Sequence, residues 1–302
     1  MRYTVLIPTL GRPSLFDLVQ QIAIDRDIAQ LDVEIVVALN GESVAFLEDQ
    51  EITLLHLSNQ PMGVGAAVNK ALLQVDEGWV WTIADDENWL PGKFRSDLGH
   101  ISKLPECSIL MPTSNFVDEI GKSMRPRIPI GKGEKVFDYL YSHLHFGRSP
   151  RYISLSGACA LRKTWISAKF PESMQTREDI EYLALQEEIG CKFVHNEQVT
   201  VGINVLLSRG ALREQNALEA LKWAELRLTE KQRVGFIGCS WVKPLVFSGN
   251  RSELRDMRVL INSGESSLSL LNRYKLHLLL RYWSIVSICL QLFTNRSQGK
   301  FQ

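Results

Sequence analysis

The stretch WVWTIADDENWLPGKF, residues 79–94, runs from an apolar segment through three consecutive acids into a Pro-Gly turn. Its first six residues are rich in types that favour strands, so we expect a buried strand over 79–84. The carboxylates of Asp85, Asp86 and Glu87 repel one another unless a cation lies among them. Mg²⁺ and Mn²⁺ take oxygen ligands, so the triplet indicates a divalent metal site, with Asp85 and Glu87 on one side of the chain if it stays extended. An ordinary acidic turn that ends a strand is the alternative.

Four more apolar runs rich in β-branched residues lie around this strand, and amphipathic stretches alternate with them. The runs cover residues 3–8, 33–39, 53–57 and 108–113. A helix is expected over residues 64–75. This alternation is typical of βαβ units, so we expect an α/β fold with a mostly parallel central sheet flanked by helices. Right-handed crossovers bring the carboxyl ends of the strands to one edge, where a ligand is expected to bind.

Composition excludes several classes of protein. The 302 residues are 45% hydrophobic and 23% charged, which is typical of a globular chain and not of a disordered or fibrous one. The 34 basic and 34 acidic residues give a net charge of zero, so no general field attracts nucleic acid. The five cysteines lack the spacing of a zinc site and are expected to be reduced thiols. No signal peptide precedes the first expected strand, so we expect a cytoplasmic protein.

The middle of the chain contains a second acidic site. Residues 115–152 follow no regular pattern and predict a long loop, and residues 152–163 predict a strand with a Gly-containing turn. A helix is expected within MQTREDIEYLALQEEIGCKF, residues 174–193. Thr176 and Asp179 have the Thr-x-x-acid spacing of a capping box at its start. A carboxylate held at a helix N-terminus can also accept a proton from a hydroxyl, so Asp179 is a candidate general base.

The last part of the chain is expected to be helical. Residues 210–232 have a charged amphipathic pattern, and polar residues follow one side of the helix expected over 272–295. The uninterrupted apolar lengths there are shorter than the ~20 residues that span a bilayer. We favour a helix that lies on an anionic membrane surface. Packing against the rest of the protein is the main alternative, and a membrane span is the least favoured.

Six sequence blocks occur in an order that resembles the family 2 glycosyltransferases of the inverting, GT-A fold type. The resemblance covers roughly residues 3–195, and the order and spacing of the blocks are more specific than any one block. The blocks are VLIPTLGRPSL (5–15), VVALNGES (36–43), NQPMGVGAAVNKAL (59–72), WTIADDENWLPGKF (81–94), SGACALRKTW (156–165) and REDIEYLALQEEIG (177–190).

The resemblance implies a nucleotide-sugar donor bound at the carboxyl edge of a Rossmann-like sheet, with its diphosphate on Mn²⁺ or Mg²⁺. It assigns the metal to Asp85, Asp86 and Glu87, and acceptor binding to Ser156 and Gly157. It makes Asp179, paired with Glu178, the base that deprotonates the acceptor hydroxyl, so that one in-line displacement inverts the anomeric carbon. The donor-binding residues that it implies are Pro8, Thr9, Arg12, Asn40, Gly63, Gly65, Asn69 and Asp85.

The expected organisation is a transferase domain over residues 1–205, with a donor part (1–115) and an acceptor part (116–205). A C-terminal helical region follows over 206–302. The expected activity is that of a hexosyltransferase, which moves the sugar to a hydroxyl of a glycan or lipid-linked acceptor in bacterial surface polysaccharide synthesis. The C-terminal helix would hold the protein peripherally at the inner face of the plasma membrane.

Two departures from the family pattern keep an alternative open. The loop after the second strand reads Ala-Leu-Asn-Gly over 38–41, where the family commonly has an Asp that contacts the nucleobase, and the metal-binding His expected beyond His195 is missing. A non-catalytic protein that retains the fold and binds a nucleotide or a glycan is therefore the alternative function. Dinucleotide binding is disfavoured, because the third glycine position of the GVGAAV segment is Val68.

Overall fold

The computed structural model forms two compact units. One consists of Met1–Val136 and Pro150–Glu214, and the other of Phe137–Ser149 and Gln215–Gln302. The segment Phe137–Ser149, from the middle of the sequence, thus belongs to the same unit as the C-terminal residues. The expected division at residue 205 does not assign it there. The structure describes residues 2–41, 51–58, 62–118, 121–143, 151–174, 177–204, 217–237, 276 and 281.

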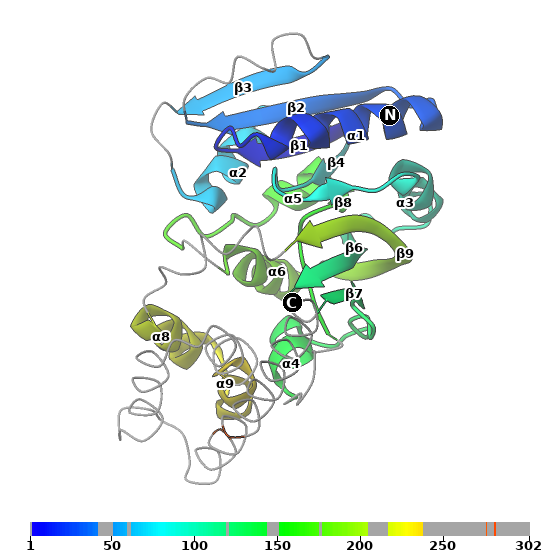
Figure 1. Cartoon of the computed structure of the whole chain (residues 1–302). Helices are drawn as coiled ribbons and strands as arrows, with labels where there is room; N and C mark the ends of the chain where they lie inside the picture. Colours follow the sequence, from blue (N-terminus) through cyan, green and yellow to red (C-terminus); the bar gives the residue numbers. More distant parts are fainter. Residues whose placement is uncertain are drawn as a thin grey trace, which may run out of the picture. The chain divides into compact units, whose positions relative to one another are not determined.

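The first unit is built on one mixed sheet (Figure 1). Among the described residues its strand order is β3-β2-β1-β4-β8-β6-β9-β5, with β7 beside β6. Strands β3, β2, β1 and β4 are parallel to one another, as are β6 and β9, whereas β8, β5 and β7 are antiparallel to their neighbours. The expected α/β fold with a mostly parallel sheet is confirmed. The strands are β1 Tyr3–Thr9, β2 Val33–Asn40, β3 Thr53–Ser58, β4 Trp79–Thr82, β5 Asn88–Trp89, β6 Ser108–Asp118, β7 Gly121–Arg125, β8 Ala158–Leu161 and β9 Lys192–Asn204.

Helices cover both faces of this sheet (Figure 1). The chain passes through α1 from β1 to β2 on one side, and through α2 from β3 back past β1 to β4, so right-handed crossovers place α1 and α2 on opposite faces. Helix α1 packs with α3, and α2 packs with α5 and α6. The described helices of this unit are α1 Ser14–Ala29, α2 Val64–Leu72, α3 Lys93–Ile101, α5 Arg162–Ile166 and α6 Glu178–Glu188. Helix α4 Val136–Tyr141 belongs to the second unit, apart from its first residue.

In the described part of the second unit, two helices form where one was expected over residues 210–232. They are α8 Ala217–Arg227 and α9 Glu230–Ile237. Between them, Thr229 Oγ1 accepts a hydrogen bond from Gln232 N at 3.4 Å, and Gln232 Oε1 accepts one from Thr229 N at 2.8 Å. This reciprocal pair is a capping box, which starts a new helix. The expectation of a single helix was wrong because the amphipathic pattern continues across this start signal.

The segment that carries the three acids is anchored in the core at both ends. The ring centroids of Trp81 and Trp89 lie 5.3 Å and 4.7 Å from that of Phe94. Below them, Asp97 accepts hydrogen bonds from Trp81 Nε1 at 2.8 Å and from Lys93 Nζ at 2.7 Å, and both members of this ion pair are almost fully buried. Since strand β4 and helix α3 are both fixed in this way, the short chain between them has little freedom.

In the part of the chain that the structure describes, no helix combines the length and the apolar character needed to cross a bilayer. The amphipathic helix expected over 272–295 lies outside the described residues, apart from Leu276 and Arg281, which are both helical. Its attachment to a membrane stays a prediction.

Candidate functional site

The candidate site lies at the edge of the sheet where the parallel strands β1 and β4 end. The register pairs Tyr3 with Trp79 and Leu6 with Thr82, so the two strands leave the sheet side by side. Residues 9–12 follow or end β1, and residues 85–87 follow β4. Because the carboxyl ends of parallel strands share one edge, segments far apart in the sequence meet here.

A hydrogen-bonded network joins these two segments. Thr9 Oγ1 donates to Asp85 Oδ2 at 2.5 Å, and Gly11 N donates to Thr9 Oγ1 at 2.8 Å. Arg12 Nη1 donates to Asp85 Oδ1 at 3.0 Å and lies 2.7 Å from Asp86 Oδ2. Burial raises the pKa of Asp85, while the hydrogen bond from Thr9 and the charge of Arg12 oppose this shift. One guanidinium therefore neutralises part of the charge of two neighbouring acids.

The chain does not stay extended across the three acids. Glu87 N donates to Ala84 O at 3.3 Å, which closes a turn, and Ala84 N donates to Ser156 Oγ at 2.9 Å. As a result Asp85 and Asp86 both reach the same guanidinium, and Glu87 faces other residues. The expectation that Asp85 and Glu87 share one side was wrong, because the alternation of an extended chain does not hold through a turn.

Glu87 is the member of the triplet without a cationic partner among the described residues. Its carboxylate accepts a hydrogen bond from the Ser156 hydroxyl, and its Oε2 atom is buried with no hydrogen-bond partner in the described part of the chain. Burial raises the pKa of Glu87 to about 8; the Ser156 hydrogen bond opposes this shift, and the charges of Asp86 and Asp179 add to it. This carboxylate is therefore stabilised by a proton or by a cation.

Helix α6 brings Asp179, with Glu178 beside it, close to Glu87. Glu178 and Asp179 lie in its first turn, and Ile180 N donates to Asp179 Oδ1 at 2.7 Å. Burial raises the pKa of Glu178 to about 7, and the charge of Asp179 adds to this shift. Burial also raises the pKa of Asp179, which is close enough to Glu87 for their charges to interact. The general base expected from the sequence and the acid at the end of β4 thus belong to one cluster.

Thr176, the expected capping partner of Asp179, lies outside the described residues, and the helix starts one residue later than a capping box from Thr176 requires. Helix α6 begins after Arg177, which has the left-handed φ of 62° and makes no side-chain cap hydrogen bond. Asp179 is therefore the second helical residue, whereas a capping box uses the third. The positive end of the helix dipole still lies beside this carboxylate and favours its ionised form.

Tyr152 is a member of the cluster that sequence reasoning missed. Burial raises the pKa of its phenol, and the charges of Glu87 and Asp179 add to the shift, so the hydroxyl stays protonated beside the two acids. Its ring packs edge-on against Phe116 at 5.2 Å between centroids. The signal available in the sequence was its place four residues ahead of Ser156, within a segment expected to be a strand.

Ser156 and Gly157, expected at the acceptor, support the acidic segment. Ser156 accepts a hydrogen bond from the backbone of this segment and donates one to Glu87. Gly157 has φ +79°, its N donates to Thr82 O at 2.5 Å, and an added Cβ would lie 2.3 Å from Val201 Cγ2. A glycine is required here both by conformation and by space. Direct contact of either residue with an acceptor stays a prediction.

Three residues of α2 and its start, expected at the donor, contact another part of the protein. An added Cβ on Gly65 would lie 2.5 Å from Pro171 O, and one on Gly63 would lie 3.1 Å from the backbone of the segment 170–172. Asn69 exchanges two hydrogen bonds of 2.9 Å with the same segment. The close backbone approach predicted for these glycines is therefore made to protein, and a contact with the donor stays a prediction.

Asn40 and Pro8 lie at the ends of β2 and β1. Asn40 Nδ2 donates to Met62 O at 2.7 Å, and Asn40 Oδ1 accepts from Met62 N at 2.9 Å. Both polar groups of this buried amide thus hold the chain that leads to α2. Pro8 pairs with Ala38 in the parallel register and is half-buried. Neither residue has a described contact that indicates a nucleotide, so their donor roles also stay predictions.

The residues of the triplet fit a divalent cation only in part. In the described regions no group of three His, Cys, Asp or Glu side chains could hold a metal ion together. Both carboxylate oxygens of Asp85 already accept hydrogen bonds, one from Thr9 and one from Arg12. Glu87 has a buried oxygen without a partner and lies close to Asp86. Since Mg²⁺ is usually bound by one or two carboxylates with phosphate oxygens and water, these two acids are compatible with such an ion.

The fold is shared with TarS of S. aureus. A structure of TarS 1-349 aligns with a TM-score of 0.52 at 12% identity, over 97% of this chain and 92% of TarS 1-349. A second TarS structure gives 0.54 at 14% identity, over 95% of this chain and 55% of that one. TarS 1-349 in complex with UDP-GlcNAc gives 0.47 at 12% identity, over 94% of this chain and 71% of that one.

TarS is a glycosyltransferase, and identities this low establish a common fold and no more. No family model matches the sequence. A search of curated proteins likewise finds no match. The GT-A-like architecture expected from the sequence is therefore shown through the TarS fold, and the activity is inferred from the site.

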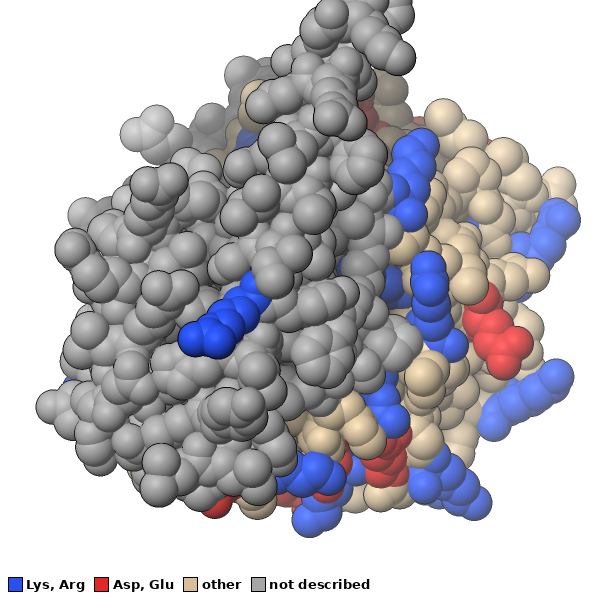
Figure 2. Space-filling view, turned by 60° about the horizontal axis from the view of Figure 1, so that its bottom comes forward, with Lys and Arg blue, Asp and Glu red and all other residues tan. Residues whose placement is uncertain are grey.

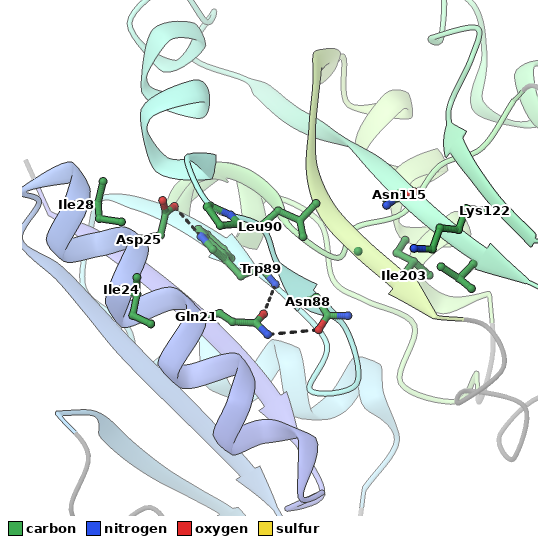
Figure 3. Close-up of a pocket in the computed structure, with 13 residues that line it drawn as sticks. Gln21, Ile24, Asp25, Ile28, Asn88, Trp89, Leu90, Asn115, Lys122 and Ile203 are labelled. Carbon is green, nitrogen blue, oxygen red and sulfur yellow. Dashed lines mark hydrogen bonds between the residues drawn. The ribbon is translucent and has the colours of Figure 1, made fainter.

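An apolar groove of about 430 Å³ is lined by residues of α1, β5, β6, β7 and β9 (Figure 3). Ile24 and Ile28 of α1 line one wall, and each is 59% exposed. Asn88, the residue after Glu87, lines the groove as well and is held by Gln21 through a 3.4 Å hydrogen bond. The opposite wall carries Asn115, Val117, Lys122 and Ile203. The groove is thus connected to the acidic segment through the chain, since Asn88 directly follows Glu87.

Proposed function

We propose that this protein is an inverting glycosyltransferase of family 2 type that moves a sugar from a nucleotide-sugar donor to a hydroxyl. The observation that carries the proposal is the meeting of Glu87, at the end of β4, with Asp179, at the start of α6. A single displacement needs stabilisation of the leaving group, which a cation at Glu87 would supply, and a base for the attacking hydroxyl, which Asp179 would supply. The TarS fold supports the assignment.

The donor's nucleotide is proposed to bind at the network that ends β1. Arg12 is 42% exposed at its side chain, so its guanidinium can meet phosphate oxygens while it holds the buried Asp85. Thr9 fixes the same carboxylate from the other side. A phosphate group at Arg12 would compete with the two aspartates for one guanidinium, and donor binding would loosen the contact with the more exposed Asp86 first.

Asp179 is proposed to remove the proton from the acceptor hydroxyl. Burial raises its pKa, which makes the carboxylate a stronger base than an exposed one. Ile180 N orients one of its oxygens, so the other can face the hydroxyl. Glu178 beside it is proposed to keep the local charge negative, and Tyr152 to donate a hydrogen bond within the cluster. The deprotonated hydroxyl then attacks the anomeric carbon, whose configuration inverts.

Mn²⁺ or Mg²⁺ is proposed as the cofactor, held by Asp86 and Glu87. A bound divalent cation supplies a Lewis acid that stabilises the charge of a diphosphate leaving group. The partnerless Oε2 of Glu87 supports this proposal. Melting temperatures measured with and without Mn²⁺ and a nucleoside diphosphate test it, since a ligand of the native state raises the melting temperature. The same rise in a Glu87→Gln variant would contradict the assignment.

The acceptor is proposed to be a glycan or a lipid-linked sugar of a bacterial surface polysaccharide, with the protein at the inner face of the plasma membrane. The apolar groove beside Asn88 supports an acceptor with an apolar part. On the face shown in Figure 2, Lys and Arg side chains are more prominent than Asp and Glu on the described surface, which supports contact with anionic headgroups. Vesicle sedimentation with and without anionic lipid measures this association.

Transfer from a panel of nucleotide sugars, with the acceptor hydroxyl presented on glycans and on lipid-linked sugars, tests the activity itself. The Asp179→Asn variant is expected to lose at least ~100-fold in kcat and to keep donor binding, because the amide cannot take the proton. Glu188→Gln, an exposed acid in the last turn of the same helix, is the matched control and is expected to keep full activity. If the Asp179→Asn variant transfers sugar at the parent's rate, the assignment of the base is wrong.

A further inference from the structure

Two cysteines lie side by side where β6 and β9 begin, at the edge of the sheet opposite to the candidate site. The parallel register pairs Ser108 with Lys192, and Lys192 N donates to Cys107 O at 3.0 Å. Cys107 and Cys191 directly precede this pair, so their side chains leave the sheet on the same face. Their thiols are within hydrogen-bonding reach of each other, and both are free.

The spacing of the two strands suits a covalent link. Neighbouring strands lie ~4.8 Å apart, and cysteines joined by a disulfide have Cα atoms ~4.4–6.8 Å apart. The backbone around Cys191 is fixed by its own hydrogen bond, since its N donates to Gln186 O at 2.9 Å. A bond between the two sulfur atoms therefore requires a rotation of side chains and no separation of strands.

The two thiols differ in access to solvent. Cys191 is 7% exposed, whereas Cys107 is half-buried and open to small reagents. Burial raises the pKa of Cys191, and the neighbouring Cys107 adds to the shift, so Cys191 reacts more slowly with external reagents. Cys159, also in this unit, is fully buried and lies in the strand β8. The accessible thiol and its buried neighbour thus form a pair with distinct roles.

We propose that Cys107 and Cys191 are a modification site that oxidised low-molecular-weight disulfides convert into a reversible cross-strand disulfide. The thiolate of Cys107 attacks one sulfur of the small disulfide, forms a mixed disulfide and releases one small thiol. The thiolate of Cys191 then attacks the Cys107 sulfur and releases the second small thiol. The protein loses two protons and two electrons, and the small disulfide gains both.

Peptide mapping of the full chain after treatment with oxidised glutathione tests this proposal. The native protein is incubated, remaining thiols are alkylated, and the chain is digested without reduction. The expected product is the Cys107 peptide joined to the Cys191 peptide, and dithiothreitol restores both thiols. Recovery of both peptides alkylated, or of Cys107 held permanently as a mixed disulfide with glutathione, would overturn the proposal.

Variants separate the two chemical steps. Cys191→Ser is expected to stop the reaction at the mixed disulfide on Cys107, and Cys107→Ser to prevent any link at Cys191. Cys159→Ser is the matched control and is expected to cross-link as the parent does. A second measurement on the parent chain needs no variant: phenylarsine oxide, which bridges two adjacent thiols, is expected to block both cysteines with one arsenic. Independent alkylation of the two thiols in its presence would overturn the proposal as well.

Discussion

His195 makes the stability of the fold depend on pH in a predictable direction. It lies in β9, pairs with Met111 in the register, and has both ring nitrogens buried with no hydrogen-bond partner among the described residues. Burial lowers the pKa of His195 to about 4. The hollow beside His195 is also lined by Arg95, Lys103 and Glu197, two cations and one anion, which do not favour a further positive charge. The native imidazole is therefore neutral.

The direction and the size of the change in the free energy of unfolding with pH follow from this pKa. An unfolded histidine has a pKa of ~6.5, so between that value and about 4 the unfolded chain binds a proton that native His195 does not. The free energy of unfolding therefore falls as the pH drops through this window and levels off below it. At a pH near the lower limit the loss is about 3 kcal/mol, because each pKa unit corresponds to ~1.4 kcal/mol and the titration is half complete there.

Urea denaturation of the parent and of a His195→Phe variant from neutral pH to about pH 4 measures this loss. Other groups titrate in the same range, but they do so in both proteins, so the difference between the two curves isolates His195. The parent is expected to lose about 3 kcal/mol more than the variant over this range. His56→Gln, at an exposed position, is the control and is expected to follow the parent. A difference between parent and His195→Phe that does not change with pH refutes the reasoning.

Three further predictions concern the support of the site. Lys93→Met leaves Asp97 charged in the core, so it is expected to lower the free energy of unfolding by ~3–5 kcal/mol in urea denaturation. Lys93→Met combined with Asp97→Leu removes both charges and is expected to cost less than the single change. Gly157→Ala is expected to cost ~2 kcal/mol or more, measured as a lower melting temperature, because φ is positive and the new methyl group overlaps β9. Gly65→Ala places a methyl group 2.5 Å from Pro171 O and is expected to lower the melting temperature and weaken donor binding together.

The sequence predicted the parts of the fold that depend on local pattern. The five expected strands all form, and the segment after β4 lies at the carboxyl edge because parallel strands with right-handed crossovers leave no other edge for it. Strand β8 was expected as a strand, but its place between β4 and β6, antiparallel to both, depends on long-range pairing. A pattern of alternating residues contains no information about which distant strand becomes the neighbour.

The directions of the side chains in the candidate site could not be predicted from the sequence. Asp85, Asp86 and Glu87 follow one another in sequence, but a turn aims the first two at Arg12 and the third at Ser156. The turn depends on a hydrogen bond from Ala84 N to a residue that lies seventy-two positions further along the chain. Sequence reasoning assigned one role to all three residues, because no local rule predicts that their side chains separate.

The acidic residues of the site therefore form two groups, which differ in whether a cation of the protein already neutralises them. The first group, Asp85 and Asp86, already has a cation in Arg12. In the second group, burial makes the charged forms of Glu87 and of the two acids of α6 unfavourable. Arg177 opposes this at the two acids of α6, whereas Glu87 has no such cation among the described residues, and its pKa rises to about 8. Binding of a proton or a cation therefore lowers the free energy of this second group. An acceptor hydroxyl that is deprotonated at this cluster supplies the proton, and the anomeric carbon supplies positive charge as the bond to the leaving group breaks. The proposed sugar transfer therefore suits this edge of the sheet better than binding alone.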